Sequence, residues 1–223
     1  MPISFFICLY FINLVGVIGI LRYKHLITPL RYIVWYIIYN VVSGWIEHIL
    51  GSYYQIHNLW LFHFNSFIEL LILLLALYSW RTSERNGDFI RWSFYLYAMI
   101  WFAGKFTFEP FNMSPHYSAI IDRCIQIGFS AWLLIAVLQE NAIPWEKDPR
   151  IWIASGIILY STSTLFLFGL FDVMLVRSPD ILKIIWHFNW YAIIFTYGLF
   201  LRSLFCKPLP TSKDVVSKTE MNS

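Results

Sequence analysis

Apolar stretches of about twenty residues recur along this chain and break only at short polar connections, a pattern typical of helices that cross a bilayer. A helix of about twenty residues is long enough to span the hydrocarbon core of a membrane. We therefore predict an all-α integral membrane protein, a seven-transmembrane-helix bundle formed by residues 1–207. The predicted helices cover residues 3–21, 32–51, 59–80, 89–106, 118–138, 151–173 and 181–205.

The composition indicates that lipid is the main solvent of the chain. Hydrophobic residues make up 59% of the 223 residues and charged residues only 13%, about half the charged fraction of a soluble domain. The basic residues form no cluster with interleaved aromatics, which argues against nucleic acid as a partner. Cys8, Cys124 and Cys206 lack the spacing of a disulfide framework or a thiolate metal site.

Lysine and arginine are divided unequally between the two sides of the predicted bundle, and this division predicts its orientation. The basic connections and the tail hold twelve of them: Arg22, Lys24, Arg31, Arg81, Arg85, Arg91, Lys147, Arg150, Arg202, Lys207, Lys213 and Lys218. The other side holds Lys105, Arg123, Arg177 and Lys183. The positive-inside rule then places the N-terminus outside and the C-terminus in the cytoplasm, with 208–223 as a disordered tail. We expect a bacterial inner (plasma) membrane.

Histidines and acidic residues gather towards the predicted outer side, whereas the inner half of the bundle is comparatively apolar. Ionisable groups inside a bilayer are costly, so each one is a candidate functional residue. The group comprises His48, His57, His63, His116 and His187, together with Glu47, Glu69, Glu109, Asp122 and Asp172.

Two of the predicted helices carry polar stripes. In helix 32–51, Asn40, Ser43, Gly44 and Glu47 share one face and His48 lies beside it. Small and polar residues of this kind also line ordinary contacts between membrane helices, so a packing role is the alternative.

The stripe on helix 59–80 consists of Asn58, Phe62, Asn65, Ser66 and Glu69, with His63 on its flank. Glu69 lies about 15 Å into the membrane, where an unpaired carboxylate is hard to maintain. It is expected to be protonated, paired or directed into a hydrated cavity.

Helices 118–138 and 181–205 add further polar residues. Asp122 and Gln126 share a face, whereas the adjacent Arg123 diverges by about 100° and is expected to reach up to the surface. His187 groups with Tyr191, which is four residues further on.

Polar side chains lie at similar depth on several of the predicted helices, and this predicts a polar ligand pocket in the outer leaflet. Its candidate residues are Asn40, Glu47, His48, His63, Asn65, Glu69, Asp122, Gln126, His187 and Tyr191. Imidazole and carboxylate groups are suitable ligands for zinc or iron, so a metal site is a second interpretation. Its candidate ligands are His48, His63, His187 and Glu47, although no H-E-x-x-H sequence is present.

The arrangement distantly resembles the CREST superfamily of seven-helix membrane hydrolases and receptors, which surround zinc with a Ser and a His on helix 2, an acid on helix 3 and two histidines on helix 7. The resemblance implies these roles for Ser43, His48, Glu69 and His187. It covers only these four residues, with a glutamate in place of an aspartate and Tyr191 in place of the second histidine.

Three functions remain open from the sequence. The first is a receptor-like or sensory protein that binds a small molecule or metal and contacts a protein partner through its cytoplasmic loops. The second is a membrane-embedded metal-dependent hydrolase that acts on lipid. The third is a structural subunit of a membrane complex.

Overall fold

The computed structural model describes residues 3–54, 59–80, 84–113, 115–140, 144–177 and 179–206. The expected tail over 208–223, His57 and Asn58 lie outside these residues, as does the side chain of Asp172. In the described part, all regular structure is helical. The long helices are α1 (Ile3–Arg22), α2 (Thr28–His48), α3 (Leu59–Ser79), α4 (Glu84–Thr107), α5 (His116–Glu140), α6 (Pro149–Arg177) and α7 (Pro179–Leu204).

Shorter helical turns accompany the long helices. The π-helical turn Ile49–Tyr53 continues α2, while Tyr23–His25 and Trp145–Lys147 are 3-10 turns in connections. Helix α2 begins at Thr28 rather than near residue 32, because Pro29 fits the first turn of a helix.

The start of α6 is fixed by an N-cap. The Arg150 backbone N–H donates to Oδ1 of Asp148 at 2.9 Å, and Pro149 occupies the first helical position. The Arg150 guanidinium also contacts Glu140 at 2.7 Å, which ties the end of α5 to the start of α6.

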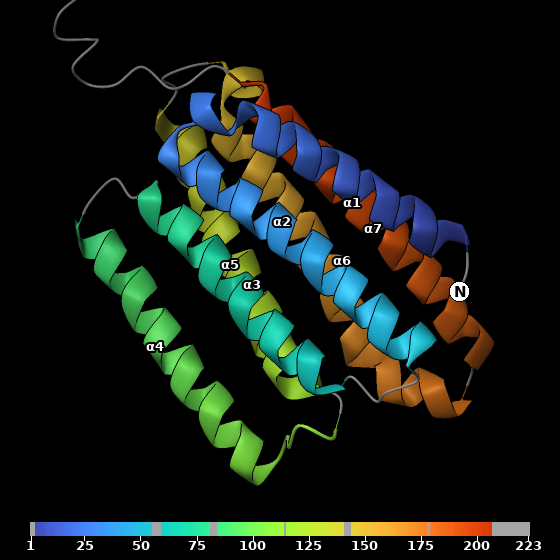
Figure 1. Ribbon diagram of the computed structural model, residues 1–223. Coiled ribbons are helices and arrows are strands. Elements are labelled where there is room, and N and C mark those ends of the chain that lie inside the picture. The colour runs from blue at the N-terminus through green and yellow to red at the C-terminus, as the bar shows by residue number, and fades with distance from the viewer. Residues whose placement is uncertain are drawn as a thin grey trace, which may run out of the picture.

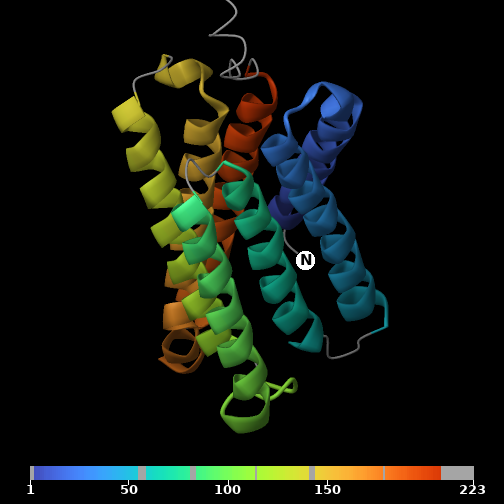
Figure 2. The same ribbon diagram turned by 90° about the vertical axis from the view of Figure 1, so that its left-hand side faces the viewer.

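Successive helices run in opposite directions, so the connections gather at two ends of the bundle (Figures 1 and 2). We call the end that carries residue 3 the N-terminal end. The connections after α2, α4 and α6 lie there. The opposite end, which we call the C-terminal end, carries residue 206 and the connections after α1, α3 and α5.

Six of the helices form a closed ring in the order α1, α2, α3, α5, α6 and α7, with α7 packed against α1. Helix α4 lies outside this ring, where it packs mainly against α3 and α5 (Figures 1 and 2). The six ring helices are long and apolar enough to cross a membrane, consistent with a multi-pass integral membrane protein. Helix α4 is not among them, because charged residues such as Asp88, Arg91 and Lys105 lower its apolar character.

The half of the ring at the C-terminal end is filled by apolar side chains. Buried there are Ile33, Ile37, Leu73, Leu77, Leu133, Ile153, Ile157, Phe200 and Leu204. Helices α6 and α7 approach closely at Gly156, where an added Cβ would lie 2.6 Å from Cε1 of Phe200. Thr196 Oγ1 donates to the Gly156 carbonyl at 3.3 Å across the same contact.

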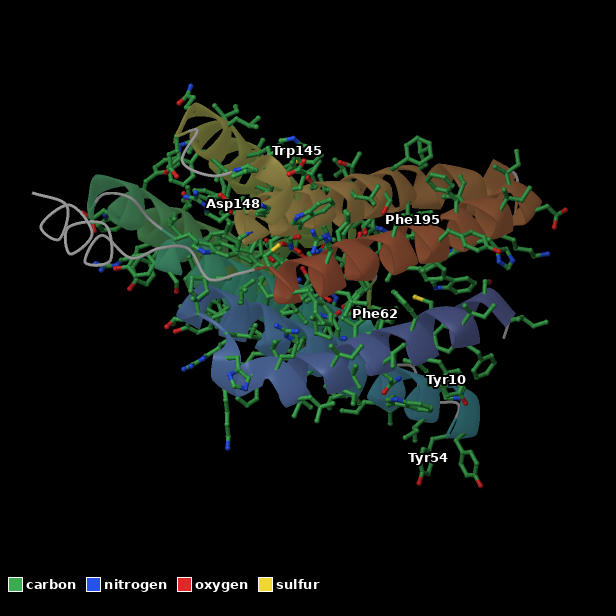
Figure 3. The ribbon with its side chains drawn as sticks, turned by 90° about the horizontal axis from the view of Figure 1, so that it is seen from above. Tyr10, Tyr54, Phe62, Trp145, Asp148 and Phe195 are labelled. Atoms are coloured by element: carbon green, nitrogen blue, oxygen red, sulfur yellow. The ribbon has the colours of Figure 1, made fainter. Side chains whose placement is uncertain are left out.

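Large aromatic side chains cover much of the outside of the bundle. Tyr10, Tyr54 and Phe195 are exposed and lie on its periphery, whereas the partly buried Phe62 lies nearer its middle (Figure 3). An apolar outer surface is what a bundle surrounded by lipid requires.

Candidate functional site: a polar cavity inside the helix ring

A cavity of about 210 Å³ lies inside the ring, in the half nearest the N-terminal end. Every ring helix contributes to its wall, whereas α4 does not. Its polar lining residues are Asn40, Ser43, Glu47, Asn65, Ser66, Glu69, Arg123, Tyr160, Thr164 and Asn189. Aromatic lining residues are Phe5, Phe62, Phe168, Trp186, Trp190 and Tyr197.

The centre of the polar wall is an ion pair between two helices. Nη2 of Arg123 on α5 lies 3.0 Å from Oε2 of Glu69 on α3. Tyr160 on α6 donates its hydroxyl hydrogen to the same carboxylate oxygen at 3.2 Å, and its ring lies 4.6 Å from the guanidinium carbon. These three side chains therefore connect three helices through charged and cation–π contacts.

The expected course of Arg123 to the surface is wrong. Its side chain is buried, with the residue only 4% exposed, and it also lies 3.6 Å from Asp122. The angle between two adjacent residues on a helix gives the directions of their side chains, but it does not show which partners lie on the neighbouring helix. Glu69 on α3 lies within reach of Arg123, and pairing two buried charges avoids the larger cost of leaving either one alone.

The guanidinium of Arg123 is only partly satisfied. Its Nη2 donates to Glu69 and contacts the Tyr160 hydroxyl, but Nε and Nη1 have no hydrogen-bond partner among the described residues. Both nitrogens are buried, and Nη1 lies 3.6 Å from Oδ2 of Asp122, an ion-pair contact longer than a hydrogen bond.

Asp122 and Gln126 lie directly behind this wall rather than on it. Ser66 donates to Asp122 at 3.1 Å, Gln126 donates to Asp122 at 2.7 Å, and Ser161 donates to Gln126 at 2.7 Å. This buried chain of hydrogen bonds connects α3, α5 and α6 and supports the position of the adjacent Arg123.

The two predicted stripes on α2 and α3 meet at another side of the cavity. The Asn65 amide donates to Glu47, and the Tyr39 hydroxyl donates to Asn65 Oδ1 at 2.5 Å. Asn40 also lines the cavity, while its own amide donates to the Tyr36 carbonyl at 2.9 Å. Polar residues of both stripes therefore face one shared space.

The candidate histidines do not line this cavity. His187 accepts or donates a hydrogen bond with Ser4 at 2.7 Å, and His48 packs against the rings of Phe5, Phe6 and Trp45. Tyr191 is 53% exposed and likewise is not part of the cavity wall.

His63 belongs to a separate buried cluster that sequence reasoning missed. Nζ of Lys105 on α4 lies 2.6 Å from Nδ1 of His63 and donates to Glu109 at 2.7 Å. Nε2 of His63 lies 2.9 Å from the Met113 carbonyl and donates to it, so Nδ1 is free to accept from lysine. The i, i+4 spacing of Lys105 and Glu109 was the signal available in the sequence.

Glu109 lies in the connection between α4 and α5 and accepts from the backbone N–H groups of Tyr117 and Ser118, at 2.7 and 3.2 Å. Burial alone would raise the pKa of Glu109. Hydrogen bonds from Lys105 and Ser118 and the positive charge of Lys105 outweigh burial, so the pKa lies below its usual value of 4.5.

The four residues predicted as metal ligands are not brought together. Glu47 contacts Asn65 and His63 contacts Lys105, while His48 and His187 pack against the neighbouring rings of Phe5 and Trp190. Among the described residues, no group of three or more His, Cys, Asp or Glu side chains is arranged to hold a metal ion. The arrangement instead provides a polar cavity whose donors and acceptors can receive an organic ligand.

Comparisons with known proteins leave the site to be interpreted from its own chemistry: no protein-family model matches the chain, and no curated protein or solved structure gives a significant match.

Proposed function

We propose that this protein is a receptor-like multi-pass membrane protein that binds a small ligand in the cavity of its helix ring. The proposal includes seven transmembrane helices, an N-terminus outside and a C-terminus in the cytoplasm. The cavity then opens towards the outer leaflet, and a protein partner reads the cytoplasmic connections. The observation that carries the proposal is the cavity with charged groups on its wall, enclosed by all six ring helices.

The construction of the wall is what favours a receptor-like role. Arg123, Glu69 and Tyr160 come from three different helices and meet at one point beside the cavity. A ligand that contacts this point interacts with α3, α5 and α6 together. If those contacts differ between two arrangements of the helices, binding shifts their populations and changes the surface at the far end of the bundle.

The other two functions have less support. A metal-dependent lipid hydrolase requires His and carboxylate ligands that converge on one ion, and among the described residues no three such side chains are arranged to hold one. A purely structural subunit gives no reason for a buried arginine whose Nε and Nη1 lack hydrogen-bond partners among the described residues, since such groups are costly unless a partner satisfies them.

Thiol labelling from outside the cell tests the outward-facing cavity. Cys8 lines the cavity wall, while Cys124 and Cys206 do not. In a C124S/C206S variant, we expect a small membrane-impermeant thiol reagent to label Cys8 in intact cells. The matched control, C8S/C124S, retains only Cys206 at the opposite end and should be labelled only after the cells are opened.

A second labelling position is needed because the buried Cys8 can react slowly with the reagent. In a cysteine-free background, F62C introduces a thiol on the cavity wall, and F195C introduces one on the outside of the bundle (Figure 3). We expect F62C to be labelled from outside faster than F195C, which faces lipid. If the external reagent labels neither Cys8 nor the cysteine of F62C, the proposal is overturned.

A further inference from the structure

We infer that the ligand of this cavity is an uncharged amphiphile whose hydroxyl or carbonyl head lies at Arg123 and whose body packs against the aromatic wall. This inference rests on the proposed function and specifies the ligand class of the same cavity.

The first argument is the set of unused donors on Arg123. Nε has no hydrogen-bond partner among the described residues and Nη1 has only the 3.6 Å ion-pair contact with Asp122, although the side chain is buried and lines the cavity. A buried donor without an acceptor is costly, and charged donors are the most costly of all. An acceptor oxygen on the head of the ligand would complete the hydrogen bonding of this guanidinium, and an ammonium group or a hydrocarbon lacks one.

The second argument is the acceptor beside those donors. The hydrogen bonds to Glu69 from Arg123 and Tyr160 both go to Oε2, and among the described residues Oε1 receives none. A hydroxyl group can accept from Arg123 and donate to Glu69 at the same time, whereas a carbonyl satisfies only the arginine. A hydroxyl head therefore fits best.

The third argument is charge. Glu69 on the wall and Asp122 directly behind it are two carboxylates, and the guanidinium of Arg123 contacts both. If all three are ionised, these groups carry an excess negative charge, so an anionic head would add a further charge without a counter-ion. In a medium of low dielectric constant this repulsion is large. An uncharged head avoids it.

The fourth argument is the apolar part of the cavity. Phe5, Phe62, Phe168, Trp186 and Trp190 form its aromatic wall. Its volume of about 210 Å³ exceeds that of an apolar cavity of about 150 Å³ that holds benzene. The space therefore suits a body little larger than one aromatic ring, attached to a short chain that carries the head.

A set of four probes with one body tests this ligand class: 3-phenylpropanol, 3-phenylpropionate, 3-phenylpropylamine and propylbenzene. Their protection of Cys8 from labelling is measured on the C124S/C206S protein in nanodiscs. We expect the alcohol to give half-protection at a concentration at least tenfold lower than the other three. A carboxylate or amine that protects better, or propylbenzene that equals the alcohol, would overturn the inference.

Substitutions of arginine then test whether the hydroxyl head of the ligand lies at Arg123. R123K retains the charge but loses the planar fork, so the advantage of the alcohol over propylbenzene should fall about tenfold. R91K, which alters an exposed arginine outside the cavity, should leave the advantage unchanged. An unchanged advantage in a folded R123K protein counts against the inference. If R123K does not fold, the probe series on the protein that retains Arg123 still decides.

The two levels of the proposal fail in different ways. If external reagent labels Cys8 and F62C but none of the four probes protects Cys8, the ligand class is wrong and the outward-facing cavity remains. If external reagent reaches neither thiol, the proposed function itself fails.

Discussion

Arg123 shows how one buried side chain can organise a membrane bundle. It pairs with Glu69 on α3, lies against the ring of Tyr160 on α6 and is adjacent to Asp122 on its own helix. In lipid, each of these groups would be costly alone, so their stability depends on one another. The same cluster that holds the helices therefore forms part of the cavity wall.

Removal of the arginine charge is expected to destabilise the protein more than removal of the whole pair. R123M leaves Glu69 buried without its counter-ion, which should cost about 3–5 kcal/mol. The double variant R123M/E69Q removes both charges and should recover part of that loss. Unfolding in detergent measures both variants, with R91M as the control at an exposed ion pair. Strictly additive costs for the two substitutions would contradict this account.

Individual site residues could be predicted from sequence only where they share a helix face. The spacing of Asn40 with Glu47 and of Asn65 with Glu69 identified residues that line the cavity. The course of Arg123 could not be found in this way, because its partner is on another helix. Depth alone also misled, since residues at one level can point in different directions around a bundle.

At the scale of helices, α6 and α7 depend on a contact that only glycine permits. An added Cβ at Gly156 would lie 2.6 Å from the buried ring of Phe200, and the Thr196 carbonyl oxygen is 3.4 Å away on the other helix. Gly169 is on the same helix, but an added Cβ there would meet nothing within 4 Å.

G156A is therefore expected to destabilise the bundle by about 1–3 kcal/mol, the usual cost of overpacking a core. G169A is the matched control and should be neutral or stabilising, because alanine favours helix formation over glycine by about 1 kcal/mol. Thermal unfolding of both variants in the same detergent measures the difference. Equal unfolding temperatures would exclude a close contact at Gly156.

Helix α4 is attached to the ring near the N-terminal end by the Lys105, His63 and Glu109 cluster. The folded pKa of Glu109 lies below its unfolded value of about 4.5. The carboxylate therefore adds stability above pH 4.5, and this contribution is lost as the pH falls through the lower folded pKa.

Hydrogen exchange in α4 should reveal this loss. We expect protection at the end of α4 near Thr107 to fall when the pH drops below about 4.5, after correction for the intrinsic exchange rate. E109Q should show weaker protection at neutral pH and a smaller change with acid. If E109Q shows the same pH response as the unmodified protein, the response arises from a titrating group other than Glu109.

The sequence predicted the type and approximate position of the helices, because long apolar stretches carry a strong signal. It placed the start of α4 near residue 89, whereas the helix begins at Glu84. Charged residues in its first turns hide helical structure from hydropathy, which measures transfer to lipid rather than backbone hydrogen bonding. The position of α4 outside the ring is a property of tertiary packing and left no periodic signal.

At the scale of the whole molecule, polarity and basic charge occupy opposite ends. The cavity lies towards the N-terminal end, while the apolar core and residues such as Arg150 and Arg202 lie towards the C-terminal end. This arrangement connects the proposed topology with the proposed function. In the proposed topology, the membrane side that carries fewer positive charges is also the side from which the proposed ligand would reach the cavity.

Helix α4 decides this topology, because it is the long helix that does not meet the apolar criteria for a span. Its two ends nevertheless lie at opposite ends of the bundle (Figure 1). If α4 crosses, reporters at the two termini lie on opposite sides, and a tag after Trp145 is cytoplasmic. If α4 does not cross, both termini lie on one side, and either the connection with Arg150 or the one with Lys24 faces outward against the positive-inside rule.

We expect protease protection in oriented vesicles to show the two termini on opposite sides of the membrane. Termini on the same side would reduce the bundle to six spans and remove the proposed orientation.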